Sequence, residues 1–356
     1  MRTYSDMKKS VQVGNIQIGG GAPVSIQSMC NTHTADVNGS LEQIRRIEEA
    51  GCEIIRLTVP DMESAKAFGE IKRKAHIPVV ADIHFDYRLA IAAIDAGADK
   101  IRINPGNIGS EDRIRAVVEK AKECHVPIRV GVNSGSLEKD ILARHGRVTA
   151  EGLAESALRN VQILERYDFD DIVISLKSSD VQMNYDAYRI VDKACDRPLH
   201  IGVTEAGTPS MGKIKSAAGI GALLLAGIGD TLRVSLTADP VEEVVFAKAL
   251  LKSIGLRNDG VEIVSCPTCG RTQVDLEKIA ESVERRAEGF EGPLKIAVMG
   301  CAVNGPGEAK GADIGVACGK GEGLLFAGGE IIKKVPEEDI VEELMKLAAE
   351  FQAKKK

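Results

Sequence analysis

The sequence predicts an α/β protein in which a (β/α)8 TIM-type barrel is followed by a smaller α+β domain. Short β-branched runs alternate with amphipathic helical stretches eight times before the pattern ends near Leu251. Strands that alternate with helices pair in parallel through right-handed crossovers, and eight such units favour a closed barrel. The alternative, a doubly wound open sheet, needs a glycine-rich phosphate turn after its first strand, and this sequence has none there.

The composition is that of an ordinary globular protein. Hydrophobic residues make up 44% and charged residues 28% of the 356 residues. Aromatic residues make up only 3%, with no Trp, and the formal net charge is -6, so nucleic-acid binding is not expected. No stretch approaches the roughly 20 apolar residues of a membrane span, and the N-terminus lacks the apolar core of a signal peptide. The eight cysteines are too sparse for a disulfide scaffold, which favours a cytoplasmic location.

The barrel elements follow in order from the N-terminus. Residues 11–26 alternate around Gly-Asn and Gly-Gly-Gly, which predicts a hairpin that closes one end of the barrel. Apolar residues at helical spacing, with capping residues such as Asp61 and Ser110, mark the helices between the strands. Gly51 and Gly97 stand where two of these helices should end. The eight strands are expected at residues 25–30, 53–59, 78–84, 100–104, 127–133, 171–177, 199–204 and 231–237.

The order of the elements changes after residues 253–260, which have the composition of a linker. A strand at 261–265, a helix at 275–288 and a strand at 294–299 are followed by short, glycine-punctuated strands to residue 335. A final helix is expected at 337–351. This order predicts a compact α+β domain, so we place the barrel domain at residues 1–255 and the second domain at residues 256–356.

The carboxyl ends of the barrel strands are the expected place for a binding site, because TIM-barrel active sites lie there. Strand side chains alternate, so residues two apart share a face. The residues expected to face inward carry five cations but only two obvious carboxylates, Asp82 and Glu205. The candidate substrate-binding residues of the barrel are Arg56, Asp82, Arg102, Arg129, Asn133, Lys177, Thr204, Arg233 and Ser235.

The surplus of cations predicts an anionic ligand. Two acids cannot neutralise five bases, and an unpaired buried charge costs several kcal/mol. Arginine binds oxyanions in a bidentate way, and Ser, Thr and Asn add donors, so phosphate or diphosphate is the natural ligand. The alternative is that these charges only pair with one another between layers of the barrel. Asp82 and Glu205 are candidates for acid–base work or for binding a substrate hydroxyl, and His84 is either a third such group or a structural residue.

A second candidate site lies in the C-terminal domain, where Cys266-Pro-Thr-Cys269 is followed by a third thiol, Cys301. Two thiols at this spacing serve zinc, iron–sulfur clusters and redox dithiols alike, and a third thiol favours a metal centre. Zinc would need a fourth ligand, for which Cys318 is the candidate. An iron–sulfur cubane with an unusual fourth ligand fits the spacing at least as well. Of the other cysteines, the expected buried hydrophobic residues are Cys52, Cys124 and Cys195, and the expected mouth residue is Cys30.

With these residues in view, the chain resembles the bacterial 4-hydroxy-3-methylbut-2-enyl diphosphate synthases of the methylerythritol phosphate pathway. The resemblance covers essentially the whole chain and includes no insertion of the kind that marks the larger plant-type members. The matching barrel segments are Ser28-Met-Cys-Asn-Thr32, Arg56-Leu-Thr58, Ala81-Asp-Ile-His-Phe85, Arg102-Ile-Asn-Pro-Gly-Asn107, Arg129-Val-Gly-Val-Asn133, Ser175-Leu-Lys177 and Thr204-Glu-Ala-Gly207. In the second domain they are Cys266-Pro-Thr-Cys-Gly-Arg271 and Met299-Gly-Cys-Ala-Val-Asn-Gly-Pro-Gly-Glu308.

The resemblance implies a [4Fe–4S] cluster whose fourth ligand is a carboxylate. Glu308 takes the place that spacing alone would give to Cys318. A carboxylate is a harder and more easily displaced ligand than a thiolate, so it would open one iron to a substrate oxygen. Asn304 and Arg271 flank the ligands and are either substrate-side residues or residues that only shape the loops. The implied ligand set is Cys266, Cys269, Cys301 and Glu308.

The family's reaction is the reductive ring opening and dehydration of 2-C-methyl-D-erythritol 2,4-cyclodiphosphate to (E)-4-hydroxy-3-methylbut-2-enyl diphosphate. Two electrons pass through the cluster from reduced flavodoxin or ferredoxin. The resemblance makes Glu205 and Glu308 the candidate catalytic residues, with Asn304 added to the substrate-binding set. It also implies a head-to-tail homodimer in which each cluster domain closes over its partner's barrel.

Two other functions stay open on the residues alone. One is a zinc-stabilised barrel lyase or transferase that acts on a phosphorylated metabolite. The other is an iron–sulfur sensor, without enzymatic activity, whose barrel binds a phosphate ligand. The colour of the anaerobic protein separates zinc from iron–sulfur, and turnover of the cyclodiphosphate separates enzyme from sensor.

Overall fold

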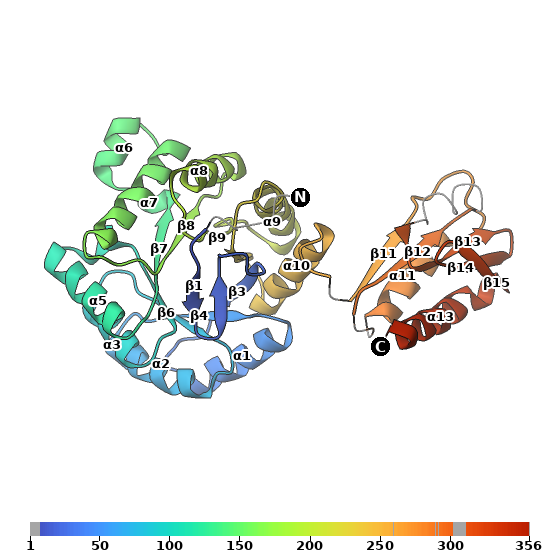
Figure 1. The fold of residues 1–356 in the computed structure, drawn as a ribbon, viewed down its shortest axis with the longest axis horizontal. Coiled ribbons are helices and arrows are strands. Elements are labelled where there is room, and N and C mark those ends of the chain that lie inside the picture. The colour runs from blue at the N-terminus through green and yellow to red at the C-terminus, as the bar shows by residue number, and fades with distance from the viewer. Residues whose placement is uncertain (1–7, 259, 289, 291, 302–310, 356) are drawn as a thin grey trace. The chain divides into compact units, whose positions relative to one another are not determined.

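The computed structural model describes residues 8–355 except 259, 289, 291 and 302–310 (Figure 1). The chain divides into two compact units, Met1–Leu256 and Arg257–Lys356. No helix in these described ranges is long and apolar enough to cross a membrane.

The first unit is the predicted barrel. After an antiparallel hairpin, eight parallel strands pair in the order β8-β7-β6-β5-β4-β3-β10-β9. An isolated parallel bridge between Ile174 and Leu199 joins the two ends of this order and closes the ring. The open doubly wound alternative is therefore wrong. The strands are β1(Val11–Val13), β2(Ile16–Ile18), β3(Ser25–Met29), β4(Ile54–Thr58), β5(Val79–Asp82), β6(Lys100–Ile103), β7(Ile128–Asn133), β8(Ile172–Lys177), β9(His200–Ile201) and β10(Thr231–Leu232).

Helices lie outside the ring of strands, as Figure 1 shows. The predicted caps hold in part: Asp61 accepts a hydrogen bond from the Ser64 amide at 2.7 Å, whereas Ser110 stands at the N-cap position without such a bond. A short 3-10 turn, Ser134–Ser136, follows β7. The helices are α1(Val37–Glu49), α2(Met62–Lys74), α3(Tyr87–Asp95), α4(Pro105–Ile108), α5(Glu111–Glu123), α6(Lys139–His145), α7(Ala150–Glu165), α8(Val181–Ala194), α9(Pro209–Leu225) and α10(Pro240–Ser253).

Alternation along each strand separates an apolar outer face from a polar inner face. Outward residues such as Ile55, Ile101 and Ile172 pack against the helices in the main core. At the amino-terminal end of the barrel the interior is apolar, because the β1–β2 hairpin packs there as predicted. This plug consists of Val11, Val13, Ile18, Ile54, Val80 and Val173. The plug therefore lies at the end of the barrel opposite the mouth.

The second unit is an α+β fold with a five-stranded sheet in the order β11-β12-β13-β14-β15. The first three strands are parallel, and the last two add antiparallel neighbours. The helices pack on one face of the sheet through a core that includes Leu276, Val298 and Leu344. The elements are β11(Val261–Ser265), α11(Leu276–Ala287), β12(Leu294–Met299), β13(Ile314–Gly319), β14(Glu322–Ala327), β15(Glu330–Pro336), η3(Glu337–Asp339) and α13(Ile340–Lys355).

Candidate active site

The barrel mouth gathers arginines around one buried carboxylate, Asp82, which ends β5 and is 2% exposed. Arg102 Nη1 lies 3.3 Å from Asp82 Oδ1, and Arg56 Nε lies 3.8 Å from Oδ2. Arg102 Nη2 also donates to the Gly131 carbonyl at 3.3 Å. A Cβ at Gly131 would collide with Arg102 Nε, so a glycine is needed for the guanidinium to lie across β7.

The charge of Asp82 is fixed by its neighbours. Burial raises the pKa of the Asp82 carboxyl, but Arg56 and Arg102, followed by His84 and Arg129, outweigh burial and lower the pKa to about 2. Asp82 is therefore ionised at neutral pH and is the anchor for the guanidiniums around it.

We expect Asp82→Asn to lower the free energy of unfolding by about 3 kcal/mol at pH 7, because Arg56 and Arg102 lose their shared carboxylate. The folded pKa is depressed, so the stabilisation is present above about pH 4 and is lost as pH falls toward 2. Denaturant unfolding of both proteins at pH 7 and at progressively lower pH measures the difference. The control is Asp95→Asn, which removes an exposed pair with Lys120. Equal losses for the two variants, or a difference that does not shrink with acid, would contradict the role of Asp82.

Arg56 and Arg233 meet at the thioether of Met29. Arg56 Nε and Nη2 lie 3.1 and 2.6 Å from Met29 Sδ, and Arg233 Nη1 lies 3.3 Å from it. A thioether sulfur is a weak acceptor. Both guanidiniums are thus directed to one point and keep donors available for a stronger acceptor such as a phosphate oxygen.

Glu243, on the first turn of α10, supplies the second buried carboxylate of the mouth, and sequence reasoning missed it. Its Oε2 lies 3.6 Å from Arg233 Nε and accepts from Ser28 Oγ at 3.3 Å, and its Oε1 accepts from the Leu236 amide at 2.9 Å. Strand alternation cannot reveal a partner that comes from a helix. The available signal was a charged residue within the apolar helical face of α10, next to Ala247.

Arg129 and Lys177 are buried among other cations. They are 1% and 8% exposed. Burial lowers the pKa of the Lys177 amine, and Arg233 and Arg129 lower it further; burial and then Arg56 do the same to the pKa of Arg129. Within the described ranges, Arg129 Nε and Nη1 have no hydrogen-bond partner. An anion placed among these groups would relieve both the repulsion and the missing hydrogen bonds.

The remaining candidates lie at the ends of their strands. Asn133, Thr204 and Ser235 are half-buried. Glu205 is exposed and has a backbone φ of 50°, a left-handed conformation that is rare outside glycine and is found at functional sites. His84 lies beyond β5, is exposed, and places Nε2 3.9 Å from Asp82 Oδ2. Its contribution to the mouth is a long contact with the aspartate.

The thiols lie on two neighbouring loops of the second unit. Cys266 follows β11 and Cys301 follows the parallel neighbour β12. The Gly300 amide donates to Cys266 Sγ at 3.2 Å, and the Gln273 amide donates to the Gly300 carbonyl at 3.4 Å. The backbone amide and side chain of Arg271 are the largest of the influences that lower the pKa of the Cys269 thiol. Both loops therefore offer hydrogen bonds to electron-rich sulfur.

Cys318 does not belong to this thiol group. It lies on the face of β13 that packs against the helices and is 0% exposed. Burial, with smaller contributions from Glu337 and Cys266, raises the pKa of its thiol to about 12. We therefore do not propose Cys318 as a ligand. Two further expectations were wrong, because Cys124 is exposed and Cys30 is buried in the main core, whereas Cys52 is buried as predicted and Cys195 is half-buried.

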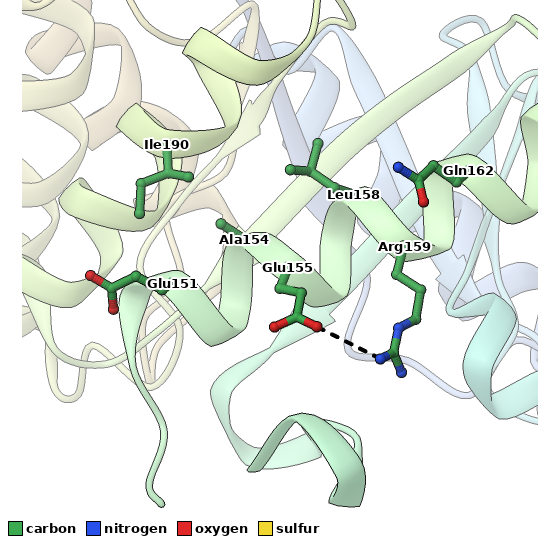
Figure 2. A pocket seen from close by; sticks show the side chains of 7 residues that line it. All are labelled: Glu151, Ala154, Glu155, Leu158, Arg159, Gln162 and Ile190. Carbon is green, nitrogen blue, oxygen red and sulfur yellow. Dashed lines mark ion pairs between the residues drawn. The ribbon is translucent and has the colours of Figure 1, made fainter. Parts of the chain in front are cut away.

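Two surface hollows lie away from both groups of residues. One, of about 420 Å³, is formed by α7 and α8 on the outside of the barrel (Figure 2). Its charged residues already pair with one another, with Arg159 Nη2 3.7 Å from Glu155 Oε1 and Arg144 Nη2 2.5 Å from the same oxygen. The other, of about 440 Å³, is lined by Ser282, Arg285, Arg286 and Val341. Neither hollow is lined by residues that were predicted to bind substrate or metal.

Comparison with known proteins places both units in one family. Residues 8–248 match the GcpE TIM-barrel domain, and residues 262–350 match the GcpE protein C-terminal domain. The chain belongs to the GcpE family. The two GcpE matches cover the barrel with its mouth and the domain with its thiol loops.

Relatives of this GcpE chain extend over nearly its full length. It is 59% identical to a 4-hydroxy-3-methylbut-2-en-1-yl diphosphate synthase (flavodoxin) of Clostridium perfringens, over 95% of this chain and 97% of that protein. It is 55% identical to the protein of the same name from Fusobacterium nucleatum, over 97% and 98% of the two chains. A dihydropteroate synthase structure from Stenotrophomonas maltophilia superposes with a TM-score of 0.49 at 14% identity, over 65% of this chain and 91% of that one.

The two thiol loops have side chains of the kind that hold an iron–sulfur cluster. Among the residues that the structure describes, no three Cys, His, Asp or Glu side chains are grouped closely enough to hold a metal ion. The residue types nevertheless suit a cluster. Three thiols lie on two adjacent loops, and backbone amides donate to two of the sulfurs. Gly300 follows β12 and directly precedes Cys301. A Cβ at this position would lie 2.9 Å from Leu276 Cδ2 and 3.1 Å from Thr272 Cγ2, so a larger residue would force its neighbours to shift. Glu308 and Asn304 lie outside the described residues.

Proposed function

We propose that this chain catalyses the reductive ring opening and dehydration of 2-C-methyl-D-erythritol 2,4-cyclodiphosphate to (E)-4-hydroxy-3-methylbut-2-enyl diphosphate. The observation that carries the proposal is the surplus of buried cations at the barrel mouth of a GcpE chain. In the described residues five cations face the carboxylates Asp82 and Glu243, so a diphosphate balances the site. The names of the full-length relatives support the same product.

The barrel residues bind and orient the substrate. Arg56 and Arg233 converge on one point, where they take one phosphate together, and Arg129 and Lys177 contribute further charge from among other cations. Arg102 is held by Asp82 and adds a further donor. Because these groups are fixed before the ligand arrives, little reorganisation is needed on binding. The polar residues that complete the set are Asn133, Thr204 and Ser235 from the barrel and Asn304 from the second unit.

Glu205 is the proposed acid–base residue of the barrel. Water is released in the reaction, so the departing hydroxyl must gain a proton. Glu205 follows Thr204 at the mouth, is open to solvent, and is held in a left-handed backbone conformation. An exposed carboxyl at this place can exchange protons with water and deliver one to the substrate oxygen.

The second unit is proposed to hold a [4Fe–4S] cluster with Cys266, Cys269, Cys301 and Glu308 as ligands. When bound, the cluster supplies electrons one at a time and a Lewis-acidic iron. The chain's part is to keep the thiols ionised and ordered, through the Gly300 amide at Cys266 and the Arg271 amide at Cys269. Glu308 contributes a carboxylate that is displaced more readily than a thiolate.

The proposed partners follow from the same comparison. Flavodoxin stands in the name of the relatives and is the proposed electron donor, with ferredoxin as the alternative. A homodimer is part of the proposal, on the strength of the family resemblance. Each of the eight cysteines is free, which supports a reducing, cytoplasmic setting.

The deciding experiment supplies the cyclodiphosphate and reduced flavodoxin to anaerobically purified protein and measures the linear allylic diphosphate. We expect a brown protein that forms this product. A colourless protein that contains zinc would favour the lyase or transferase alternative. A brown protein that binds the cyclodiphosphate without converting it would favour the sensor.

Glu308→Ala tests the carboxylate ligand. We expect the variant to retain part of its iron, because three thiolates remain, but to lose turnover by roughly 100-fold, as for loss of a group that tunes a metal site. Iron content, the visible spectrum and product formation measure the outcome. Glu330→Ala, which removes an exposed glutamate at the start of β15, is the control. Unchanged turnover in Glu308→Ala would refute the ligand role.

A further inference from the structure

Beneath the mouth, the barrel interior holds a second group of polar side chains that the proposed reaction does not require. Each of them stands two residues before a mouth position on its own strand, as Lys100 does before Arg102. Alternation therefore makes it face the interior one step deeper. We call this group the interior layer; it consists of Gln27, Lys100, His200 and Thr231.

The interior layer is fully buried and poorly satisfied. All four side chains are at most 1% exposed. In the described part of the chain, hydrogen-bond partners are lacking for Lys100 Nζ, both ring nitrogens of His200, both amide atoms of Gln27 and Thr231 Oγ1. A buried polar atom left without a partner costs roughly 1–3 kcal/mol, and such atoms are few in folded proteins. So many unsatisfied polar atoms in one layer indicate a bound ligand that interacts with them.

The two titratable side chains of the layer, Lys100 and His200, are both bases. Burial, then Arg129 and Arg56, lower the pKa of the Lys100 amine, and burial, then Arg129 and Lys177, lower the pKa of His200. An anion bound beside them would offset this repulsion. The nearby carboxylate of Asp99 is already engaged, with the Val79 amide at 2.7 Å and Lys72 Nζ at 2.8 Å. The layer itself contains no carboxylate. Its donors outnumber its acceptors, because the lysine side chain only donates.

The apolar plug of the β1–β2 hairpin packs against strand residues at the amino-terminal end of the interior. The interior of an eight-stranded barrel is just wide enough for its side chains. These two features limit the ligand to something small. We propose that the interior layer binds a monovalent anion of halide size, contacted by Lys100 Nζ and a His200 N–H. This site is separate from the mouth and does not depend on the proposed reaction.

The solution test follows thermal unfolding of the full-length, cluster-loaded protein in sodium chloride and in sodium gluconate at equal ionic strength. Saturating inorganic diphosphate is present throughout, to occupy the mouth. Wild-type protein should gain roughly 3 °C in Tm between low and high chloride, as for one weak ligand site. Lys100→Met should lose this dependence. Lys122→Met, an exposed lysine that bonds the Tyr167 carbonyl, should keep it.

Crystals of the wild-type protein grown in bromide locate the site without any variant. An anomalous peak between Lys100 and His200, together with a chloride-dependent Tm, supports the proposal. Bromide at the mouth alone, or a wild-type Tm that does not respond to chloride, overturns it. A Lys100→Met protein that is more stable than wild type by the same amount in both salts also overturns it, because the lysine would then be an unpaired charge that binds nothing.

Discussion

Replacing Cys269 with serine is expected to remove most of the visible absorbance of the protein and to lower turnover by at least about 100-fold. Cys269 is exposed, and the Arg271 amide and side chain favour its thiolate, so it is suited to bind metal rather than to fill a core. The serine hydroxyl is a poor replacement because it does not ionise near neutral pH. Iron and sulfide content, the anaerobic spectrum and product formation measure the effect.

The matched control for this change is Cys124→Ser, which alters another exposed cysteine, at the end of α5. It should leave iron, colour and turnover unchanged. Cys318→Ala gives a second comparison: it opens a small gap in the core and lowers stability, but the cluster should remain. Full iron and sulfide in Cys269→Ser would remove that thiol from the ligand set. Loss of the cluster from a well-folded Cys318→Ala protein would restore the ligand set that spacing alone suggested.

Replacing Lys177 with methionine should weaken substrate binding about 100-fold without destabilising the protein. Loss of a buried charged contact to a ligand costs about 3 kcal/mol, which corresponds to this factor. The residues that most affect the Lys177 pKa are all cations, led by Arg233 and Arg129. Removing its charge therefore relieves repulsion in the free protein, and the free energy of unfolding should stay equal or rise. Binding of the cyclodiphosphate, KM and denaturant unfolding measure the two effects.

This pair of measurements separates the two interpretations of the barrel cations. If the cations only formed ion pairs with carboxylates between barrel layers, Lys177→Met would lower stability and leave binding unchanged. Arg115→Met, which breaks an exposed pair with Glu119, is the control and should change neither quantity appreciably. The iron–sulfur spectrum should be the same in all three proteins. A spectrum that collapsed in Lys177→Met would show that the residue had been given the wrong role.

Much of the fold follows from local patterns. The eight repeats, the hairpin plug and the change of order after residue 253 all appear where periodicity placed them. The last two strands of the ring are shorter than predicted. β9 and β10 contain two residues each, because the backbone leaves regular pairing before Gly202 and Arg233 reach the mouth. Alternation nevertheless continues through these irregular ends and keeps Arg233 on the inner side.

The site was less predictable than the fold. Strand alternation predicts on which face of a strand a side chain lies, but not which residue it contacts. It placed Asp82, Arg56 and Arg102 at one end of the barrel, but it could not say that both arginines share the aspartate. It also gave no warning of Glu243, which reaches Arg233 from a helix on the outside of the ring. Contacts of this kind depend on how a helix packs, and packing is decided by the whole surface of both elements.

By itself, the sequence determined the barrel, the cationic mouth and the three spaced thiols, since each depends on periodicity or on spacing along one segment. Only the tertiary structure decided that Met29 lies between Arg56 and Arg233, and that Cys318 is buried in the core against the helices. It also decided that Lys100 and His200 are both buried without hydrogen-bond partners among the described residues. The physical reason is that strands far apart in the chain become neighbours only when the ring closes, and only then do their buried charges meet.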